Sequence, residues 1–300
     1  KARPLQEVLE DSEQPMFNRA VSGLYPPGSI FKIVTAIAGL QEEVIDRLTK
    51  IEDTGQIELG GMSFSNWYFT EYGKTEGMVD IIKAIQRSND IYFYRVGQRL
   101  GIKKLADWAK YFGLGSPLGI DIPGEAGGVV PDPEWKKAEK MESWYTGDTI
   151  ITAIGQGDLQ LTPLQVNQIT SVIAADGNFC KPYLNKERKP ECFKLEIEEK
   201  NLALTAEGMK KACSEGGTGW PFFDFQPQVG CKTGTAEFGD PDDKTHAWFT
   251  VFAPWEEPEI VVTVLLEKAG GGADKAAPVA KELLEYWFEG EKGSEKINLK

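Results

Sequence analysis

The segment "LYPPGSIFKIVTAIAGL" (residues 24–40) constrains the fold of this chain more than any other stretch. Its Pro-Pro-Gly turn does not readily continue a helix backwards, so the helix that follows is predicted to begin at or near Ser29 and to reach about Leu40. Apolar residues leave this helix hardly any polar face, which indicates burial on most sides. Lys32 must therefore find partners or lose its proton, because an unpaired buried ammonium group is very costly.

Ser29 and Lys32 are three positions apart, so a helix places them side by side on one face and we expect them to touch. The simpler interpretation makes Ser29 an N-cap and Lys32 a solvated surface residue. The apolar flanks favour a functional interpretation, because a lysine whose pKa is lowered by burial can serve as a general base near neutral pH.

Size and charge limit the possible functions. The chain has 300 residues, 41% of them hydrophobic, which suffices for one large domain or two small ones. A net charge of −13 argues against nucleic acid or an anionic membrane surface as the main partner. No run of eighteen apolar residues occurs, and the first residues do not have the pattern of a signal peptide.

The sequence offers little for a metal site. Its four cysteines (Cys180, Cys192, Cys213 and Cys231) lack close CxxC pairing, and His246 is the only histidine. We therefore predict neither a metal centre nor a cofactor. The residues alone leave open whether the thiols form disulfides.

Periodicity changes along the chain from helical to alternating. Helices are predicted at 29–40, 78–87, 90–99, 102–112, 162–175 and 205–215, with loops or short strands at 50–77 and a long loop at 114–146. Alternating runs predict three strands and a closing helix, at 228–238, 246–254, 259–268 and 273–289. Helices gathered early and strands gathered late indicate an α+β domain with helices packed on an antiparallel sheet.

Two further polar clusters can carry chemistry. "SND" (Ser88–Asp90) lies between two helical patterns, where such residues are most often an N-cap. "KTGT" (Lys232–Thr235) lies within a strand pattern, where a bulge at Gly234 is the simpler interpretation. A glycine also lets another backbone approach closely, and the flanking lysine and hydroxyls suit a carboxylate.

Taken in this order, the three clusters resemble the Ser-x-x-Lys, Ser-x-Asn (or Ser-x-Asp) and Lys-Thr-Gly signature of penicillin-recognising serine acyltransferases. More closely, the chain resembles the transpeptidase domain of class B penicillin-binding proteins, of the elongation-type penicillin-binding protein 2 group. The matching stretches are "PMFNRAVSGLYPPGSIFK", "SNDIYFY", "GIDIPGE", "PDPEWK", "GDTIITAIGQGDLQLTPLQ", "KTGTAE" and "HAWFTVFAP".

The resemblance implies a fold and an activity. The fold is the penicillin-binding protein and serine β-lactamase type, an antiparallel sheet flanked by helices with an all-helical subregion. The activity is that of a peptidoglycan D,D-transpeptidase, which cross-links stem peptides through a serine acyl-enzyme and is acylated and inhibited by β-lactams.

The resemblance also implies catalytic roles. Ser29 attacks the carbonyl group between two terminal D-alanines, and Lys32 accepts its proton. Lys32 is kept neutral by burial and by a second cation, Lys232. Ser88 relays a proton to the leaving amine, and the backbone N–H groups of Ser29 and Thr235 form the oxyanion hole.

The substrate-binding residues implied by the resemblance are Asp90, Thr233, Gly234 and Thr235. Lys232 and the two threonine hydroxyls hold the substrate's terminal carboxylate. Asp90 replaces the Asn of many relatives, which puts an amide-type substrate contact there in question.

The family resemblance further implies partners, location and domain bounds. The expected partners are a stem peptide ending in D-Ala-D-Ala, β-lactam antibiotics, a SEDS-type glycosyltransferase and elongation-machinery proteins. The expected location is the periplasmic face of the bacterial inner membrane, with an N-terminal anchoring helix outside this chain. We expect an irregular lead-in at 1–23 left from a truncated upstream region, a transpeptidase domain at 24–290 and a polar tail at 291–300.

One departure from the family concerns the sheet. Relatives have two strands well upstream of the serine, whereas only 28 residues precede Ser29 here and none forms a strong strand pair. The strand at 259–268 is therefore expected to have an open edge.

Three alternatives remain open at the level of sequence. A Ser-His-Asp hydrolase needs His246 as its base, but no Gly-x-Ser-x-Gly elbow is present. A serine β-lactamase needs a group that speeds deacylation, and the nearby acidic candidate, Glu125, lacks the Glu-x-x-Leu-Asn context of class A enzymes. A β-lactam-sensing, non-catalytic domain of the same fold would show no exchange of D-alanine peptides.

Overall fold

The structure is a computed structural model that describes the backbone of residues 4–297 and the side chains of residues 4–290. Its strands are β1 (Ile51–Asp53), β2 (Gln56–Leu59), β3 (Met62–Ser65), β4 (Gly77–Val79), β5 (Asn178–Cys180), β6 (Cys192–Lys194), β7 (Gly230–Glu237), β8 (Thr245–Ala253) and β9 (Ile260–Leu266). Its α-helices are α1 (Leu5–Leu9), α2 (Arg19–Ser22), α3 (Lys32–Gln41), α4 (Trp67–Tyr72), α5 (Ile81–Gln86), α6 (Asp90–Leu100), α7 (Ile102–Tyr111), α8 (Pro133–Lys140), α9 (Thr146–Ala153), α10 (Pro163–Ala174), α11 (Glu199–Ala212) and α12 (Ala277–Ile297). Single turns of other helix types are η1 (Gly28–Phe31), η2 (Trp220–Phe222) and η3 (Gly272–Ala276).

Alternating apolar residues in the last third of the chain build the central antiparallel sheet, whose strand order is β7-β8-β9. Along β8, Phe249 and Val251 belong to one core cluster, whereas Trp248 and Phe252 belong to another. Successive side chains of a strand point to opposite faces, so both faces of this sheet are buried.

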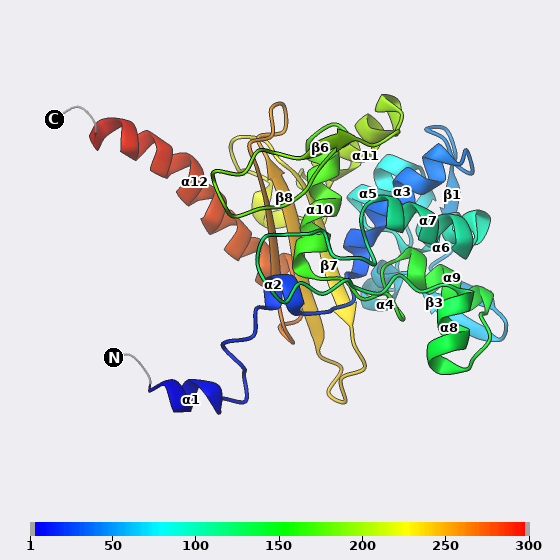
Figure 1. The fold of residues 1–300 in the computed structure, drawn as a ribbon. Coiled ribbons are helices and arrows are strands. Elements are labelled where there is room, and N and C mark those ends of the chain that lie inside the picture. Colours follow the sequence, from blue (N-terminus) through cyan, green and yellow to red (C-terminus); the bar gives the residue numbers. More distant parts are fainter. Residues whose placement is uncertain (1–3, 298–300) are drawn as a thin grey trace.

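Helices cover both faces of the sheet. Helices α3 and α10 pack in the core with Trp248 and Phe252, and α12 packs in the core with Phe249 and Val251. Figure 1 shows the sheet at the centre, with the helical subregion from α3 to α9 beside it. The predicted α+β class, with an antiparallel sheet flanked by helices and a helical subregion, is confirmed.

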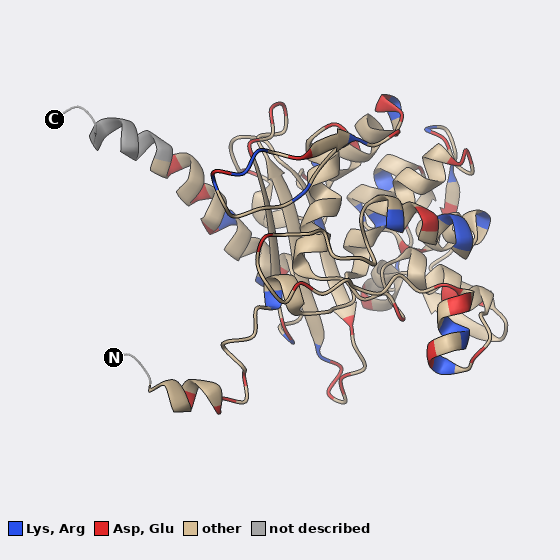
Figure 2. Cartoon of the chain, in the orientation of Figure 1, with Lys and Arg blue, Asp and Glu red and all other residues tan. Residues whose placement is uncertain are grey.

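Charged residues lie mainly on the peripheral helices and loops, and few occur along the central sheet (Figure 2). Among the described residues, no group of three or more His, Cys, Asp or Glu side chains could hold a metal ion. Within the same residues, no helix has the length and apolar character that crossing a membrane requires.

The three predicted strands of the sheet are confirmed, and β9 is an edge strand of the described sheet, as the sequence indicates. Helices α6, α7 and α10 also match their predicted ranges. Gly101 and Gly113 follow α6 and α7 with positive φ angles, a conformation that glycine adopts readily at the end of a helix.

Four segment predictions are wrong in part. The segment predicted as loops or short strands at 50–77 also contains the helix α4. The helix predicted at 78–87 is shorter, because β4 takes its first residues and the Asp80 side chain caps α5 by accepting the Lys83 N–H at 2.9 Å. The loop predicted at 114–146 contains α8, which has an Asp132 cap and Pro133 at its first position. Helix α11 begins at Glu199 rather than 205.

The ends of the chain have more helix than the predicted lead-in and tail suggest. Helices α1 and α2 lie within residues 1–23, and α12 continues past residue 290 to Ile297. The domain bounds themselves stay predictions, and residues 1–3 and 298–300 lie outside the described part of the chain.

All four cysteines form disulfides, which answers a question that the sequence leaves open. Cys180 pairs with Cys192 across β5 and β6, and Cys213 at the end of α11 pairs with Cys231 in β7.

Close packing of α6 gives a test of the fold. A Cβ at Gly97 would clash with the Ala153 side chain of α9, so Gly97→Ala is expected to destabilise the protein by about 1–3 kcal/mol. Gly290→Ala in α12 is the matched control, since nothing lies near that position and alanine favours helix. Urea unfolding measures both variants, and equal effects would contradict the close α6–α9 contact.

Candidate active site

Backbone contacts fix the turn that begins with Ser29. Gly28 has a φ of 55° and donates its N–H to the Gly155 carbonyl at 2.9 Å. Trp248 Nε1 donates to the Pro26 carbonyl at 3.0 Å from the other side. The serine therefore lies on η1, immediately before α3, as the sequence predicts.

The Ser29 side chain is partly exposed and, among the described residues, makes no hydrogen bond. Its backbone N–H donates to no carbonyl within the described chain. Both groups are thus available to a ligand. The predicted contact with Lys32 is not a hydrogen bond here, because the lysine donates elsewhere.

Lys32 is fully buried, and its Nζ has three acceptors. It donates to the Ser88 carbonyl at 2.8 Å, to Ser88 Oγ at 3.2 Å and to Asp90 Oδ1 at 2.6 Å. The Phe93 ring lies 5.7 Å from Nζ. An ammonium group has three donors, so every one of them is satisfied inside the protein.

Ser88 connects the two lysines of the site. Its Oγ accepts from Lys32 and also from Lys232 Nζ, at 2.8 Å. Its φ of 53° lies in the left-handed region, which is unfavourable for a non-glycine residue. The next residue, Asn89, caps α6, since its Oδ1 accepts the Tyr92 N–H at 2.9 Å.

Lys232 extends from β7 and is fully buried. It donates to Ser88 Oγ and to the Thr233 carbonyl, the latter at 2.9 Å, and no carboxylate among the described residues pairs with it. Gly234 packs closely against the turn that precedes Ser29, since a Cβ there would lie 3.2 Å from the Pro27 carbonyl oxygen.

The two predicted carboxylate-binding threonines have different surroundings. The Thr233 hydroxyl is nearly buried and donates to Thr218 Oγ1 at 2.8 Å. Thr235 is exposed, and its Oγ1 accepts only a long bond from the Gly272 N–H, at 3.4 Å. The side-chain amide of Gln156 lies against the same edge of β7, at Thr235 to Glu237.

Burial lowers the pKa of both lysines, but Asp90 offsets the effect at Lys32. The pKa of Lys232 is lowered further, first by burial and then by the positive charge of Lys32. These contacts favour Lys32 as the cation and Lys232 as the amine that loses its proton first. The sequence prediction has Lys32 neutral and Lys232 as the cation, and this order stays a prediction; it did not include the ion pair between Asp90 and Lys32.

Asp90 is buried, and both its carboxylate oxygens have protein partners. Oδ1 pairs with Lys32, and Oδ2 accepts the Trp67 N–H at 2.9 Å. Its own N–H donates to Asn66 Oδ1 at 3.1 Å. In this arrangement Asp90 is a partner of Lys32, and its predicted contact with the substrate stays a prediction.

Sequence reasoning missed the residues that support Asp90. Asp53 is buried and accepts from the Asn66 and Asn89 side-chain amides at 2.8 and 2.9 Å. It also accepts the backbone N–H groups of Gly55 and Glu76. Asp and Asn are common beside turns, so no signal distinguished these residues from ordinary turn formers.

Two residues considered for other mechanisms have structural contacts instead. His246 stacks on Phe238 with ring centroids 4.2 Å apart, and its Nδ1 accepts the Lys268 N–H at 3.2 Å. Glu125 accepts three backbone N–H groups, those of residues 118–120, at 2.7 to 3.1 Å. Neither side chain makes a hydrogen bond to Ser29. For His246, this disfavours a Ser-His-Asp triad.

The chain is similar to known proteins over nearly its whole length. The family model of the penicillin binding protein transpeptidase domain matches residues 3–285. Peptidoglycan D,D-transpeptidase MrdA of Haemophilus influenzae is 36% identical over 94% of this chain and 47% of its own length. The Acinetobacter baumannii protein of that name is 34% identical, over 94% of this chain and 45% of its own length.

Solved structures show the same similarity. A penicillin-binding protein (PBP2) from Helicobacter pylori has a TM-score of 0.87 and 34% identity, covering 95% of this chain and 53% of that one. Pseudomonas aeruginosa PBP2 in complex with WCK 5153 has a TM-score of 0.86 and 33% identity, covering 94% of this chain and 65% of that one. The chain spans about half the length of the curated relatives. With the motif residues gathered around one buried amine pair and the match running through the domain, this chain belongs to the penicillin-binding protein transpeptidase family.

Proposed function

We propose that this chain is the transpeptidase domain of an elongation-type peptidoglycan D,D-transpeptidase. Its substrate is a stem peptide ending in D-Ala-D-Ala, and β-lactams acylate and inhibit it. The observation that carries the proposal is the buried series Lys32–Ser88–Lys232, which begins one helical turn after a serine whose hydroxyl is unbonded among the described residues.

The proposed reaction has two acyl transfers. Ser29 Oγ attacks the carbonyl carbon between the two D-alanines, and Lys32 Nζ accepts its proton. The C–N bond breaks as Ser88 Oγ passes its proton to the leaving nitrogen and receives from Lys32 the proton that Ser29 lost, and D-alanine departs. An amine of a second stem peptide then attacks the ester and loses a proton to Lys32. The C–O bond to Ser29 breaks, and Lys32 returns this proton to Ser29 Oγ, which transfers the peptide and restores the serine. The N–H groups of Ser29 and Thr235 stabilise the oxyanion.

Lys32 must be neutral to accept a proton, and substrate binding allows it to lose its own. A substrate carboxylate beside Lys232 favours the protonated form of that amine. Lys32 then gives a proton to Ser88 Oγ while the Ser88 hydroxyl proton moves to Lys232. Lys32 is left neutral, so the lysine order expected from the sequence is reached when the carboxylate is bound.

Similar solved structures support the proposed partners. A Helicobacter pylori structure contains PBP2 with MreC, and another similar structure concerns a peptidoglycan synthase complex that coordinates polymerization and crosslinking. We extend these to elongation-machinery proteins and a SEDS-type glycosyltransferase as partners of this chain. The corresponding location is the periplasmic face of the inner membrane, with an anchoring helix outside this chain.

Intact-protein mass spectrometry after incubation with a penicillin tests the nucleophile. The wild-type protein is expected to gain one adduct, and Ser29→Ala none, with an unchanged unfolding temperature because Ser29 Oγ has no partner to lose. Ser63→Ala, at another exposed serine, is the control and should be labelled like the wild type. An adduct on the Ser29→Ala variant would refute the assignment.

The lifetime of that adduct separates the alternatives. A long-lived adduct favours a transpeptidase, whereas rapid turnover of the β-lactam favours a β-lactamase. Glu125 is occupied by three backbone N–H groups, which already disfavours it as a deacylating base. Failure to exchange D-alanine peptides with a supplied amine acceptor would favour a non-catalytic domain.

Replacing Asp90 by Asn tests whether this carboxylate raises the pKa of Lys32. The carboxylate raises the pKa of Lys32 and also that of Lys232, so Asp90→Asn lowers both. The groups facing Lys32 are Asp90 on α6, Lys232 on β7, the Ser88 hydroxyl and the Phe93 ring. More Lys32 is then neutral at a given pH, and the rising limb of the pH profile of the acylation rate should move to lower pH.

The measurement is the second-order rate constant for acylation of Ser29 across acid to alkaline pH. A limb that stays in place, or moves to higher pH, would show that Asp90 does not set the charge of the base.

The Thr235 hydroxyl gives a separate test of carboxylate binding. Thr235→Val should slow acylation by about two- to tenfold, because it removes one hydrogen bond to the ligand. Thermal unfolding should hardly change, since the hydroxyl is exposed and its bond to the Gly272 N–H is long. Unchanged acylation kinetics would remove this side chain from the site.

A further inference from the structure

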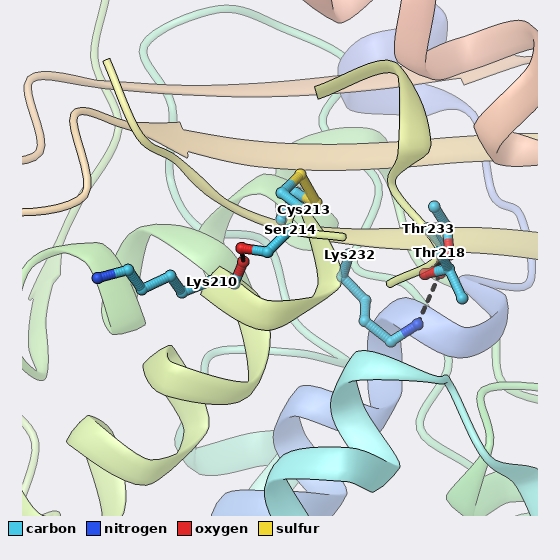
Figure 3. Close-up of a disulfide and its surroundings, with 7 residues drawn as sticks. Lys210, Cys213, Ser214, Thr218, Lys232 and Thr233 are labelled. Atoms are coloured by element: carbon cyan, nitrogen blue, oxygen red, sulfur yellow. Dashed lines mark hydrogen bonds between the residues drawn. A yellow bond between two sulfur atoms is a disulfide. The ribbon is translucent and has the colours of Figure 1, made fainter. Parts of the chain in front are cut away.

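The Cys213–Cys231 disulfide lies next to the proposed carboxylate-binding residues. Cys213 ends α11, and Cys231 immediately precedes Lys232 in β7. Their Cα atoms are 5.7 Å apart, and both residues are buried. Figure 3 shows the disulfide between the end of the helix and the strand from which Lys232 and Thr233 extend.

A glycine-rich loop, residues 214–219, folds over this disulfide. A Cβ at Gly219 would lie 2.6 Å from Cys231 Sγ, so only glycine fits against the sulfur. The Gly219 N–H donates to the Ala212 carbonyl at 2.7 Å. Arg87, the residue before Ser88, donates through Nη1 to the Gly216 carbonyl at 2.9 Å. The loop is thus fixed to the disulfide and to the segment that carries Ser88.

The loop contributes one hydroxyl to the site. Thr218 Oγ1 accepts the Thr233 hydroxyl at 2.8 Å, and Figure 3 shows Thr218, Thr233 and the amine of Lys232 close together. Lys232 Nζ in turn donates to the Thr233 carbonyl. The orientation of Thr233 therefore depends on a loop whose support is the disulfide.

We propose that the Cys213–Cys231 disulfide and Thr218 are positioning residues, which fix Thr233 and Lys232 for the carboxylate of the substrate. The inference rests on the proposed function and adds two parts that none of the three motifs contains. The disulfide fixes β7 one residue before Lys232, and Thr218 fixes the rotamer of the next side chain.

The second disulfide provides a matched control. Cys180 and Cys192 are exposed and join the β5–β6 hairpin, and among the described residues neither bonds to a motif residue. Removing it with Cys180→Ser and Cys192→Ser should therefore leave acylation as in the wild type.

The test compares two probes, benzylpenicillin and its methyl ester, which lacks the free carboxylate. The measured quantity is the second-order rate constant for acylation of Ser29, followed by intact-protein mass spectrometry. The double variant Cys213→Ser with Cys231→Ser should lose about fivefold or more with benzylpenicillin and nothing with the ester. Damage to the whole site would instead slow both probes alike.

Variants of Thr218 keep the test decisive if the double variant does not fold. Thr218→Val should slow benzylpenicillin by about two- to tenfold and spare the ester, and Thr218→Ser should restore the wild-type rate because it keeps the hydroxyl. Equal loss with both probes, or no loss with either, overturns the inference while labelling of wild-type Ser29 upholds the proposed function. No labelling of the wild type overturns the proposed function and this inference with it.

Discussion

The structure depends on one buried amine whose every hydrogen has an acceptor. Lys32 Nζ draws its three partners from a single three-residue segment, Ser88 to Asp90, so one side chain joins α3 to the start of α6. Removing one partner of a buried ion pair typically costs about 3–5 kcal/mol, because the other charge is left uncompensated. The contacts that hold these two helices together therefore include the carboxylate that raises the pKa of Lys32 against the effect of burial.

Sequence predicts the parts of this arrangement that depend on local spacing. The helix at Ser29 follows from a Pro-Pro-Gly turn and apolar neighbours, and the sheet follows from alternation. Ser29 and Lys32 share a turn for the same reason. The roles of Ser88 and Lys232 come from the resemblance, and in the structure Lys32 and Lys232 both donate to Ser88 Oγ.

The rest could not be read from the sequence because tertiary contacts decide it. The sequence does not show whether the Asp90 carboxylate pairs with a ligand or with Lys32. The packing of α6 against α3 brings it to Lys32. Thr218 lies in "GGTGW", which has no periodicity, so nothing linked it to Thr233 across fifteen positions. Helix α8 is different, since Asp132 and Pro133 are a start signal that was present in the sequence and overlooked.

Asp53, at the end of β1, supports the site from a segment that contains none of the three motifs. Its carboxylate accepts from the side chains of Asn66 and Asn89. Asn66 in turn accepts the Asp90 N–H, and Asn89 is the residue directly before Asp90. A substitution at Asp53 can therefore displace Asp90, and with it the partner of Lys32, although Asp53 precedes Ser88 by 35 positions and belongs to none of the three motifs.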